Sequence, residues 1–235
     1  MNKAAVIVFP GSNCDRDVFL AVKRSMAKFG QTPVFVWHAD KTLPAGVELV
    51  VLPGGFSYGD YLRCGAIAAR SPIMGEVVRH ANRGGYVLGI CNGFQVLTET
   101  GLVEGALVRN QGLKFICKDV SLRVEATSSP FTSQYQSNQI VTMPVAHHDG
   151  CYVADSDVIK KMEDQNMIAF RYASSNGTVG NETNPNGSMG SIAGVFNAKG
   201  NVLGMMPHPE RYSEQPLGGV DGNALFDGVI ERIIG

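Results

Sequence analysis

Short runs of apolar residues alternate along the chain with segments in which apolar residues recur at helical spacing. The apolar runs predict strands at residues 6–9, 33–37, 47–52, 86–90, 168–172, 192–196 and 202–205. Helical spacing predicts helices at residues 15–29, 62–69, 73–82, 92–99 and 225–233. We expect Asn13 or Asp15 to cap the first helix. Strands that are apolar throughout indicate a parallel sheet that helices cover on both faces.

A second region of the chain has a looser pattern. Residues 114–125 predict one or two antiparallel strands, and residues 139–145 predict another strand. Residues 173–191 are rich in Asn, Gly and Ser and predict a loop. No internal repeat or linker divides the chain. The prediction is an α/β fold with a central, mostly parallel sheet and a small antiparallel section, in one domain over residues 1–235.

Composition narrows the class of protein. Of 235 residues, 44% are hydrophobic and 17% are charged, which is typical of a globular protein. A net charge of -1 gives no basic field for nucleic acid or an acidic membrane, and no apolar stretch is long enough to span a bilayer. The five cysteines include no CxxC pair, which favours reduced thiols. We therefore expect a cytoplasmic protein without nucleic-acid or membrane partners.

The segment from Gly85 to Gln95 carries the strongest chemical signal. An apolar run ends at Cys91, a predicted helix follows, and Gly89 and Gly93 flank the cysteine. This G-x-nucleophile-x-G pattern is typical of a sharp strand-to-helix turn that exposes a nucleophile. Unpaired N–H groups at the start of the helix favour a thiolate. The pattern predicts a nucleophilic cysteine, although an isolated cysteine is more often a buried, inert thiol.

A histidine and a glutamate after the last predicted strand supply a base. His208 and Glu210 are separated by Pro209, and an extended segment would place both side chains on one side. The carboxylate can then orient the imidazole and stabilise its charged form. With Cys91 these residues predict a thiol–imidazole–carboxylate triad. A metal site on the same residues is the alternative, but the usual ligand spacings are absent, so no metal is predicted.

Two glycines after the third predicted strand suggest an anion-binding loop. Gly54 and Gly55 let the backbone approach a ligand and direct N–H groups at it, although such turns are also common as plain loops. The other four cysteines (Cys14, Cys64, Cys117 and Cys151) have no base nearby in the sequence and are interpreted as structural.

The segments at residues 89–95 and 207–210 resemble the class I, triad-type glutamine amidotransferases. Residues 53–63, 184–188 and 204–211 narrow the resemblance to the PurQ family, the glutaminase subunits of phosphoribosylformylglycinamidine synthase. The resemblance extends from residue 8 to residue 211. It implies a flavodoxin-like amidotransferase fold and a cytoplasmic role in purine biosynthesis.

The resemblance also implies roles for individual residues. Cys91 attacks the glutamine side-chain amide, His208 transfers protons and Glu210 orients His208. Backbone N–H groups of Gly55 and Asn92 are expected to bind the oxyanion. The expected contacts with glutamine are Gly54, Gly55, Phe56, Gln95, His148 and Asp149. The pair His148–Asp149 departs from the Gly–Glu usual in the family, and this departure either alters glutamine affinity or is tolerated at the surface.

The implied partners are a PurL-type synthetase subunit and a small PurS-type subunit, with glutamine as substrate. The resemblance implies no cofactor in this chain, because ATP and Mg²⁺ are used by the synthetase. No Gly-x-x-x-x-Gly-Lys-Ser/Thr pattern occurs in the sequence, as this division predicts. Three alternatives stay open at this point: a glutaminase subunit of another amidotransferase, a stand-alone cysteine hydrolase, and a catalytically silent binding subunit.

Overall fold

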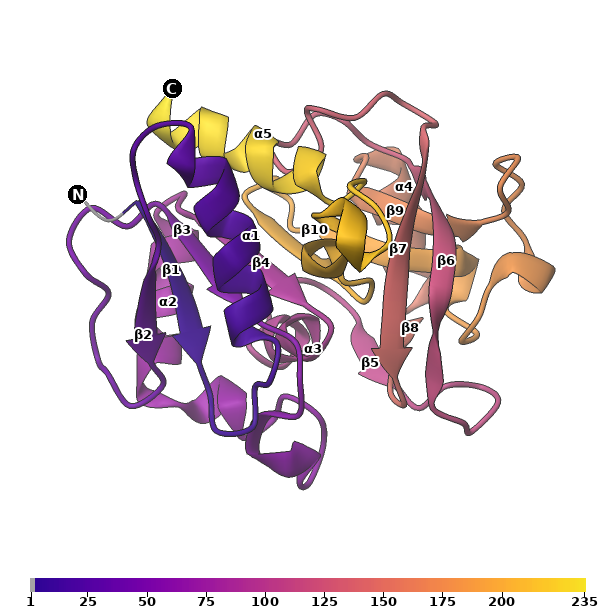
Figure 1. The fold of residues 1–235 in the computed structure, drawn as a ribbon. Coiled ribbons are helices and arrows are strands. Elements are labelled where there is room, and N and C mark those ends of the chain that lie inside the picture. Colours follow the sequence, from indigo (N-terminus) through magenta and orange to yellow (C-terminus); the bar gives the residue numbers. More distant parts are fainter. Residues whose placement is uncertain (1–2) are drawn as a thin grey trace.

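A nine-stranded sheet runs through the computed structural model, which describes residues 3–235 (Figure 1). Its strand order is β2-β1-β3-β4-β11-β10-β9-β6-β7. The strands are β1 (Ala4–Val8), β2 (Val34–Trp37), β3 (Leu49–Leu52), β4 (Tyr86–Ile90), β6 (Ile116–Val124), β7 (Ile140–His147), β9 (Ile168–Ala173), β10 (Ile192–Phe196) and β11 (Val202–Met205). Strands β2, β1, β3, β4 and β11 are parallel, in the order of flavodoxin-like sheets, whereas β10, β9, β6 and β7 continue the sheet antiparallel.

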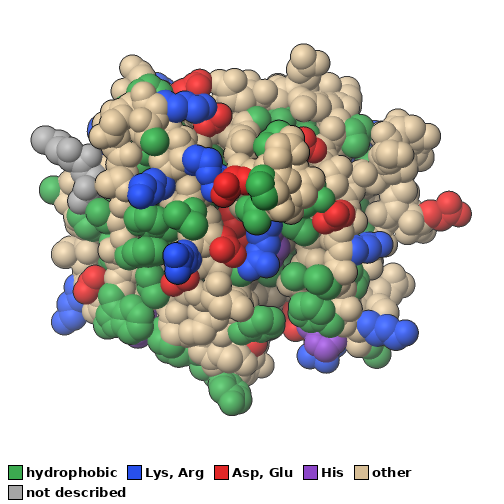
Figure 2. Space-filling model, in the orientation of Figure 1, with side chains coloured by type: hydrophobic (Ala, Val, Ile, Leu, Met, Phe, Trp, Pro, Cys, Tyr) green, Lys and Arg blue, Asp and Glu red, His purple; other side chains and the backbone are tan. Residues whose placement is uncertain are grey.

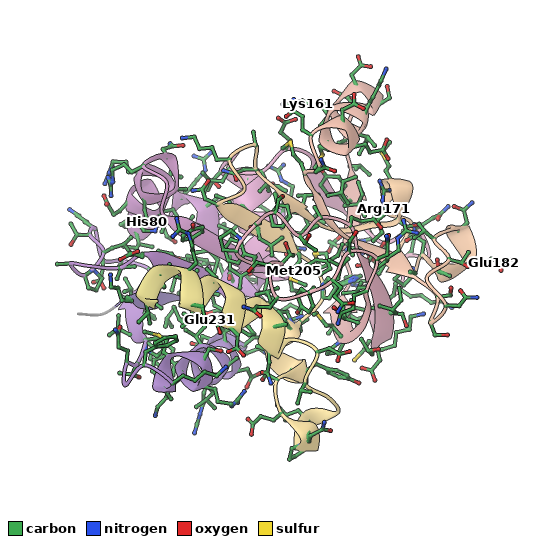
Figure 3. All side chains as sticks on the ribbon, turned by 90° about the horizontal axis from the view of Figure 1, so that it is seen from above. His80, Lys161, Arg171, Glu182, Met205 and Glu231 are labelled. Atoms are coloured by element: carbon green, nitrogen blue, oxygen red, sulfur yellow. The ribbon has the colours of Figure 1, made fainter. Side chains whose placement is uncertain are left out.

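Helices cover both faces of the parallel part of the sheet. They are α1 (Asp15–Ala27), α2 (Pro72–Asn82), α3 (Asn92–Glu99) and α5 (Asn223–Ile234), whereas α4 (Ser156–Asp164) lies beside the antiparallel strand β9 (Figure 1). Figure 1 shows α1 and α5 in front of the parallel strands and α2 and α3 behind them. Every residue of β3 is buried and so is Met205 at the end of β11, which lies near the middle of the molecule in Figure 3. These apolar strands are therefore the core that the sequence pattern predicts.

Three short elements were not predicted from the sequence. Helix α4 precedes β9, and a separate two-stranded antiparallel sheet pairs β5 (Ala106–Val108) with β8 (Cys151–Val153). A strand of three residues gives too few positions for periodicity to show. Only Met162 of α4 is buried, so the apolar face of this helix is narrow. The short length of β5 and β8 and the narrow apolar face of α4 therefore leave only a weak pattern in the sequence.

The predicted helix at residues 62–69 is wrong. This segment holds a short 3-10 turn at Ala68–Arg70, and Leu62 (φ 70°) and Gly65 (φ 80°) have left-handed backbones. A Cβ atom at Gly65 would lie 2.7 Å from Val96 N, so the chain here approaches α3 too closely for a helix. The predicted cap of α1 is also wrong, because Cys14 occupies the cap position and its side chain makes no capping bond, whereas Asp15 is the first residue of the helix and its Oδ1 accepts only from the neighbouring Arg16 N–H.

The ends of four parallel strands bring the predicted functional segments to one edge of the sheet. Strands β1, β3, β4 and β11 point the same way, so the segments that follow them share the carboxyl edge. These segments contain Cys14, Gly54, Cys91 and His208. Within residues 3–235, no helix combines the length and the apolar character that crossing a membrane requires.

Candidate active site

Cys91 lies on a strained turn between β4 and α3. Its φ of 50° and ψ of -105° are unusual for a residue with a side chain, and the strain is typical of a nucleophile elbow. A Cβ atom at Gly93 would lie 2.0 Å from Leu52 O, and one at Gly89 would lie 2.6 Å from Gly93 O. Both positions therefore need glycine for α3 to begin so close to the sheet. The Cys91 side chain is 5% exposed, and its thiol donates to Ala146 O at 3.6 Å.

The predicted base and its orienting carboxylate are in contact. His208 Nδ1 lies 2.6 Å from Glu210 Oε1, and both side chains are buried. This pairing leaves His208 Nε2 without a partner among residues 3–235. The backbone differs from the extended segment expected, because Pro209–Tyr212 forms a 3-10 turn. The carboxylate reaches the ring because the turn begins directly after His208.

The charge state of His208 is set by opposing effects. Burial lowers the pKa of His208, but the negative charges of Glu210 and then of a Cys91 thiolate act in the other direction. Together, the two negative charges outweigh the effect of burial and hold the pKa of His208 well above its ordinary value. The protonated form of the His208 imidazole is therefore favoured, and an imidazolium next to a cysteine is the arrangement that activates a thiol.

Gly54 lies close to both Cys91 and His208. A Cβ atom on Gly54 would lie 2.7 Å from His208 Cε1 and 3.4 Å from Cys91 Cβ. The next residue, Gly55, has a φ of 124°, a conformation that favours glycine. The structure thus brings the glycine loop to the triad, as the sequence predicted. The oxyanion role of the Gly55 and Asn92 N–H groups stays a prediction, consistent with Asn92 being the first residue of α3.

A second thiol lies at the same histidine. Cys14 Sγ, a His208 ring nitrogen and a Glu210 carboxylate oxygen lie within 4.8 Å of one another. Arg211 Nη2 donates to Cys14 Sγ at 3.4 Å, so a cation bound there would meet a guanidinium charge. The interpretation of Cys14 as a cysteine without a nearby base is therefore wrong. Its position after β1 was the available signal, because β1 ends at the same edge as β4 and β11.

The amide of Gln95 is used within the protein. Its Oε1 accepts from Asn92 Nδ2 at 2.8 Å, and its Nε2 donates to Asp149 O at 2.6 Å. Asn92 Oδ1 also accepts from the Ser57 N–H at 3.0 Å. The side chains of Asn92 and Gln95 thus join α3 to the loop of Ser57 and to the loop of Asp149. The prediction that Gln95 contacts glutamine stays a prediction.

The other residues predicted to contact glutamine lie on the loops that follow β3 and β7. Phe56 is 48% exposed, and His148 is half-buried against Phe115. Asp149 forms an ion pair with Arg109, with 3.3 Å between Oδ1 and Nε. Their predicted roles are unchanged by the structure, which places the loop of His148 and Asp149 directly after β7.

Buried polar residues near this loop were not predicted from the sequence. Asn110, His147 and Asn186 are at most 3% exposed. Burial, and then the charge of His208, lower the pKa of His147 to about 4. Residues 184–188 were singled out in the sequence only through the family resemblance, and Asn110 carried no signal. Single polar residues between strands do not reveal their burial from the sequence.

The fold and the Cys91–His208–Glu210 arrangement define a triad-type glutamine amidotransferase domain. The CobB/CobQ-like glutamine amidotransferase domain family matches residues 1–217. A Rhodospirillum rubrum protein named phosphoribosylformylglycinamidine synthase subunit PurQ is 54% identical over 98% of this chain and 99% of its own length. A Cereibacter sphaeroides protein of the same name is 55% identical over 97% of both chains.

The solved structures agree with these relatives. A chain from "Structure of PurLQS from Thermotoga maritima" has a TM-score of 0.85 and 44% identity over 98% of both chains. A second Thermotoga maritima glutamine amidotransferase, 13% identical with a TM-score of 0.61, shares the fold over 99% of this chain and 98% of its own. This chain therefore belongs to the CobB/CobQ-like glutamine amidotransferase family and, within it, to the PurQ family.

Proposed function

We propose that this chain hydrolyses glutamine to glutamate and supplies the ammonia to a synthetase subunit. That subunit converts formylglycinamide ribonucleotide to formylglycinamidine ribonucleotide with ATP, in purine biosynthesis. The observation that carries the proposal is Cys91 on a strained elbow beside the buried His208–Glu210 pair. Relatives named as PurQ subunits over nearly the full length support the particular reaction.

The geometry suggests the following sequence of steps. With the proton of the Cys91 thiol held on His208 Nε2, the thiolate adds to the side-chain carbonyl carbon of glutamine. His208 then protonates the leaving nitrogen, ammonia departs and a γ-glutamyl thioester remains. Water loses a proton to His208 and attacks the thioester, which releases glutamate and the Cys91 thiol. Glu210 holds Nδ1 throughout, so that Nε2 faces the reaction.

The partners proposed for this chain follow from its relatives. A PurL-type synthetase subunit and a small PurS-type subunit would complete the enzyme, in line with the PurLQS complex solved from Thermotoga maritima. ATP and Mg²⁺ would act on the synthetase, with no cofactor in this chain. We further propose a cytoplasmic location and a single glutaminase domain over residues 1–235.

Substitution of the nucleophile tests this proposal. In a complex with the synthetase subunits, Cys91→Ala should abolish glutamine-dependent synthesis, because no thioester can form. Synthesis from added ammonia should continue at the wild-type rate. Both rates are measured with the same complex by the appearance of formylglycinamidine ribonucleotide. Glutamine-dependent synthesis that survives the substitution would rule out Cys91 as the nucleophile.

A further inference from the structure

A cluster of buried amide and hydroxyl side chains lies behind the loop at residues 147–150. Its members Asn110, Asn186 and Ser188 are at most 2% exposed, and Asn110 is far in the sequence from the other two. None of the three belongs to the thiol–imidazole–carboxylate arrangement. Buried polar groups are costly unless each is hydrogen bonded, so their partners indicate what the cluster holds in place.

Asn110 binds the first half of this loop. Its Nδ2 donates to His147 O at 2.9 Å, and its backbone N–H donates to His148 O at 2.8 Å. Its Oδ1 accepts from the Gly150 N–H at 3.0 Å. One side chain and one backbone group of Asn110 thus fix three backbone groups of the loop.

Two further amides bind the second half of the loop. Gln95 Nε2 donates to Asp149 O at 2.6 Å, and Asn186 Nδ2 donates to Gly150 O at 2.7 Å. Together with Asn110, they bond every carbonyl oxygen from residue 147 to residue 150. A loop whose consecutive carbonyls are all held by buried donors has little freedom to change its backbone.

The same network fixes the tautomer of His147. Asn110 Nδ2 uses both of its hydrogens, because it also donates to Lys114 O at 2.9 Å. Asn110 Oδ1 must therefore be the acceptor in its 3.1 Å contact with His147 Nδ1, which carries the ring hydrogen. His147 Nε2 is left as a buried acceptor without a partner among residues 3–235.

The loop held in this way lies beside the nucleophile. The residue before it, Ala146, accepts from the Cys91 thiol through its carbonyl oxygen. Gln95, which holds Asp149 O, lies in the first turn of α3 after Cys91. A shift of the loop would therefore change the wall of the site in which glutamine has to be aligned.

We propose that Asn110 and Asn186 are positioning residues for the glutamine-dependent reaction, which set the backbone of loop 147–150 against the Cys91 site. This inference rests on the proposed function. It also gives the segment at residues 184–188 a role: Asn184 Oδ1 accepts from the Gly187 N–H and Asn186 Oδ1 from the Ser188 N–H, both at 3.0 Å. These bonds shape the segment so that Asn186 Nδ2 points at the loop.

The test uses Asn110→Asp and Asn186→Asp in the complex with the synthetase subunits. Each change keeps the shape of the side chain but removes a donor to the loop. The matched control is Asn201→Asp, because Asn201 is 6% exposed and donates to Ala81 O at 2.9 Å and Gly85 O at 2.7 Å. Asn201 precedes β11 and so lies at the opposite end of the sheet from Cys91.

We expect kcat/KM for glutamine to fall about 10–100-fold in both loop variants, mainly through a higher KM, because a misplacement of about 1 Å is enough for such a loss. Synthesis from ammonia should stay within about 2-fold of wild type. Asn201→Asp should lower the melting temperature but keep the KM for glutamine. In Asn110→Asp, the new carboxylate beside Nδ1 should also raise the pKa of His147, which NMR titration of its ring protons measures.

The inference would be overturned if both loop variants kept the glutamine kinetics of wild type and lost only stability, as Asn201→Asp does. The cluster would then have a structural role only. If Asn110→Asp does not fold, the kinetics of Asn186→Asp decide. A wild-type complex that uses ammonia but not glutamine would instead contradict the proposed function, so the two failures are distinguishable.

Discussion

His208 illustrates how single residues set the chemistry of the site. A buried imidazole is normally neutral, yet Glu210 at 2.6 Å and the Cys91 thiolate favour its charged form. The pKa of His208 in the folded protein therefore lies above that of the unfolded chain. The resulting contribution to stability is fully present below the unfolded pKa of about 6.5 and is lost as the pH rises through the folded pKa.

Glu210→Gln should remove this effect. We expect kcat for glutamine to fall about 10²–10⁴-fold, because the neutral amide neither stabilises the imidazolium nor fixes its tautomer. The stability lost relative to wild type should be largest below about pH 6.5 and shrink at higher pH, as chemical denaturation across a pH series measures. Glu214→Gln is the control, because Glu214 pairs with Arg24 at the surface. A kcat within a few-fold of wild type would contradict the role of Glu210.

The residues of the triad could be predicted from the sequence because each stands directly after an apolar run. Strand direction alone then places Cys91 and His208 at one edge. Cys14 follows β1 in the same way. It was missed because it lies in a polar segment and no flanking G-x-x-x-G pattern marks it as a functional cysteine. The roles of Asn110 and Asn186 could not be predicted from the sequence. Asn110 meets His147 because β6 pairs with β7, and Asn186 meets Gly150 because the loop at residues 173–191 folds back onto the loop after β7.

At the scale of elements, the elbow depends on close packing of α3 against the sheet. Strand β4 and helix α3 were predicted with the boundaries that the structure has, because a continuous apolar run changes to helical spacing at Cys91. The helix predicted at residues 62–69 was wrong for the opposite reason. Its apolar spacing is adequate, but Leu62 and Gly65 adopt left-handed backbones that a helix cannot contain, and the spacing of side chains does not reveal this.

Two glycine-to-alanine substitutions test the packing of the elbow. Gly93→Ala should destabilise the protein by about 3 kcal/mol, because the new Cβ would lie 2.0 Å from Leu52 O. Gly75→Ala in α2 should stabilise it by about 0.5–1 kcal/mol, because only the flexible end of Arg79 comes within 4 Å. Urea denaturation measures both. Equal effects at the two positions would show that close packing of α3 does not constrain Gly93.

At the scale of the whole molecule, one sheet combines two kinds of strand pairing. The parallel strands carry the nucleophile and the base at their carboxyl edge, while β7 of the antiparallel extension brings loop 147–150 to the same site. The pairing of the His208 N–H with Pro144 O at 2.9 Å joins the two parts. The sequence predicted both regions but not their junction, because this contact joins segments that are far apart along the chain.

The charged side chains on one face of the protein are of mixed sign. Figure 2 shows basic and acidic side chains close together over the middle of one face, with hydrophobic side chains beside them, rather than a field of one sign. Such a face gives no general attraction for polyanions. We therefore expect the association with a synthetase subunit to depend on local fit and to survive moderate salt.

The most direct test of the central claim is to trap the thioester. The wild-type complex is mixed with labelled glutamine, quenched in acid and digested, and the labelled peptide is identified by mass spectrometry. We predict one glutamyl group on Cys91, formed by addition of glutamine and loss of ammonia, and the same result in Cys14→Ala, which retains the nucleophile. Label on Cys14, or no label on any cysteine while ammonia is released, would contradict the assignment of Cys91 as the nucleophile.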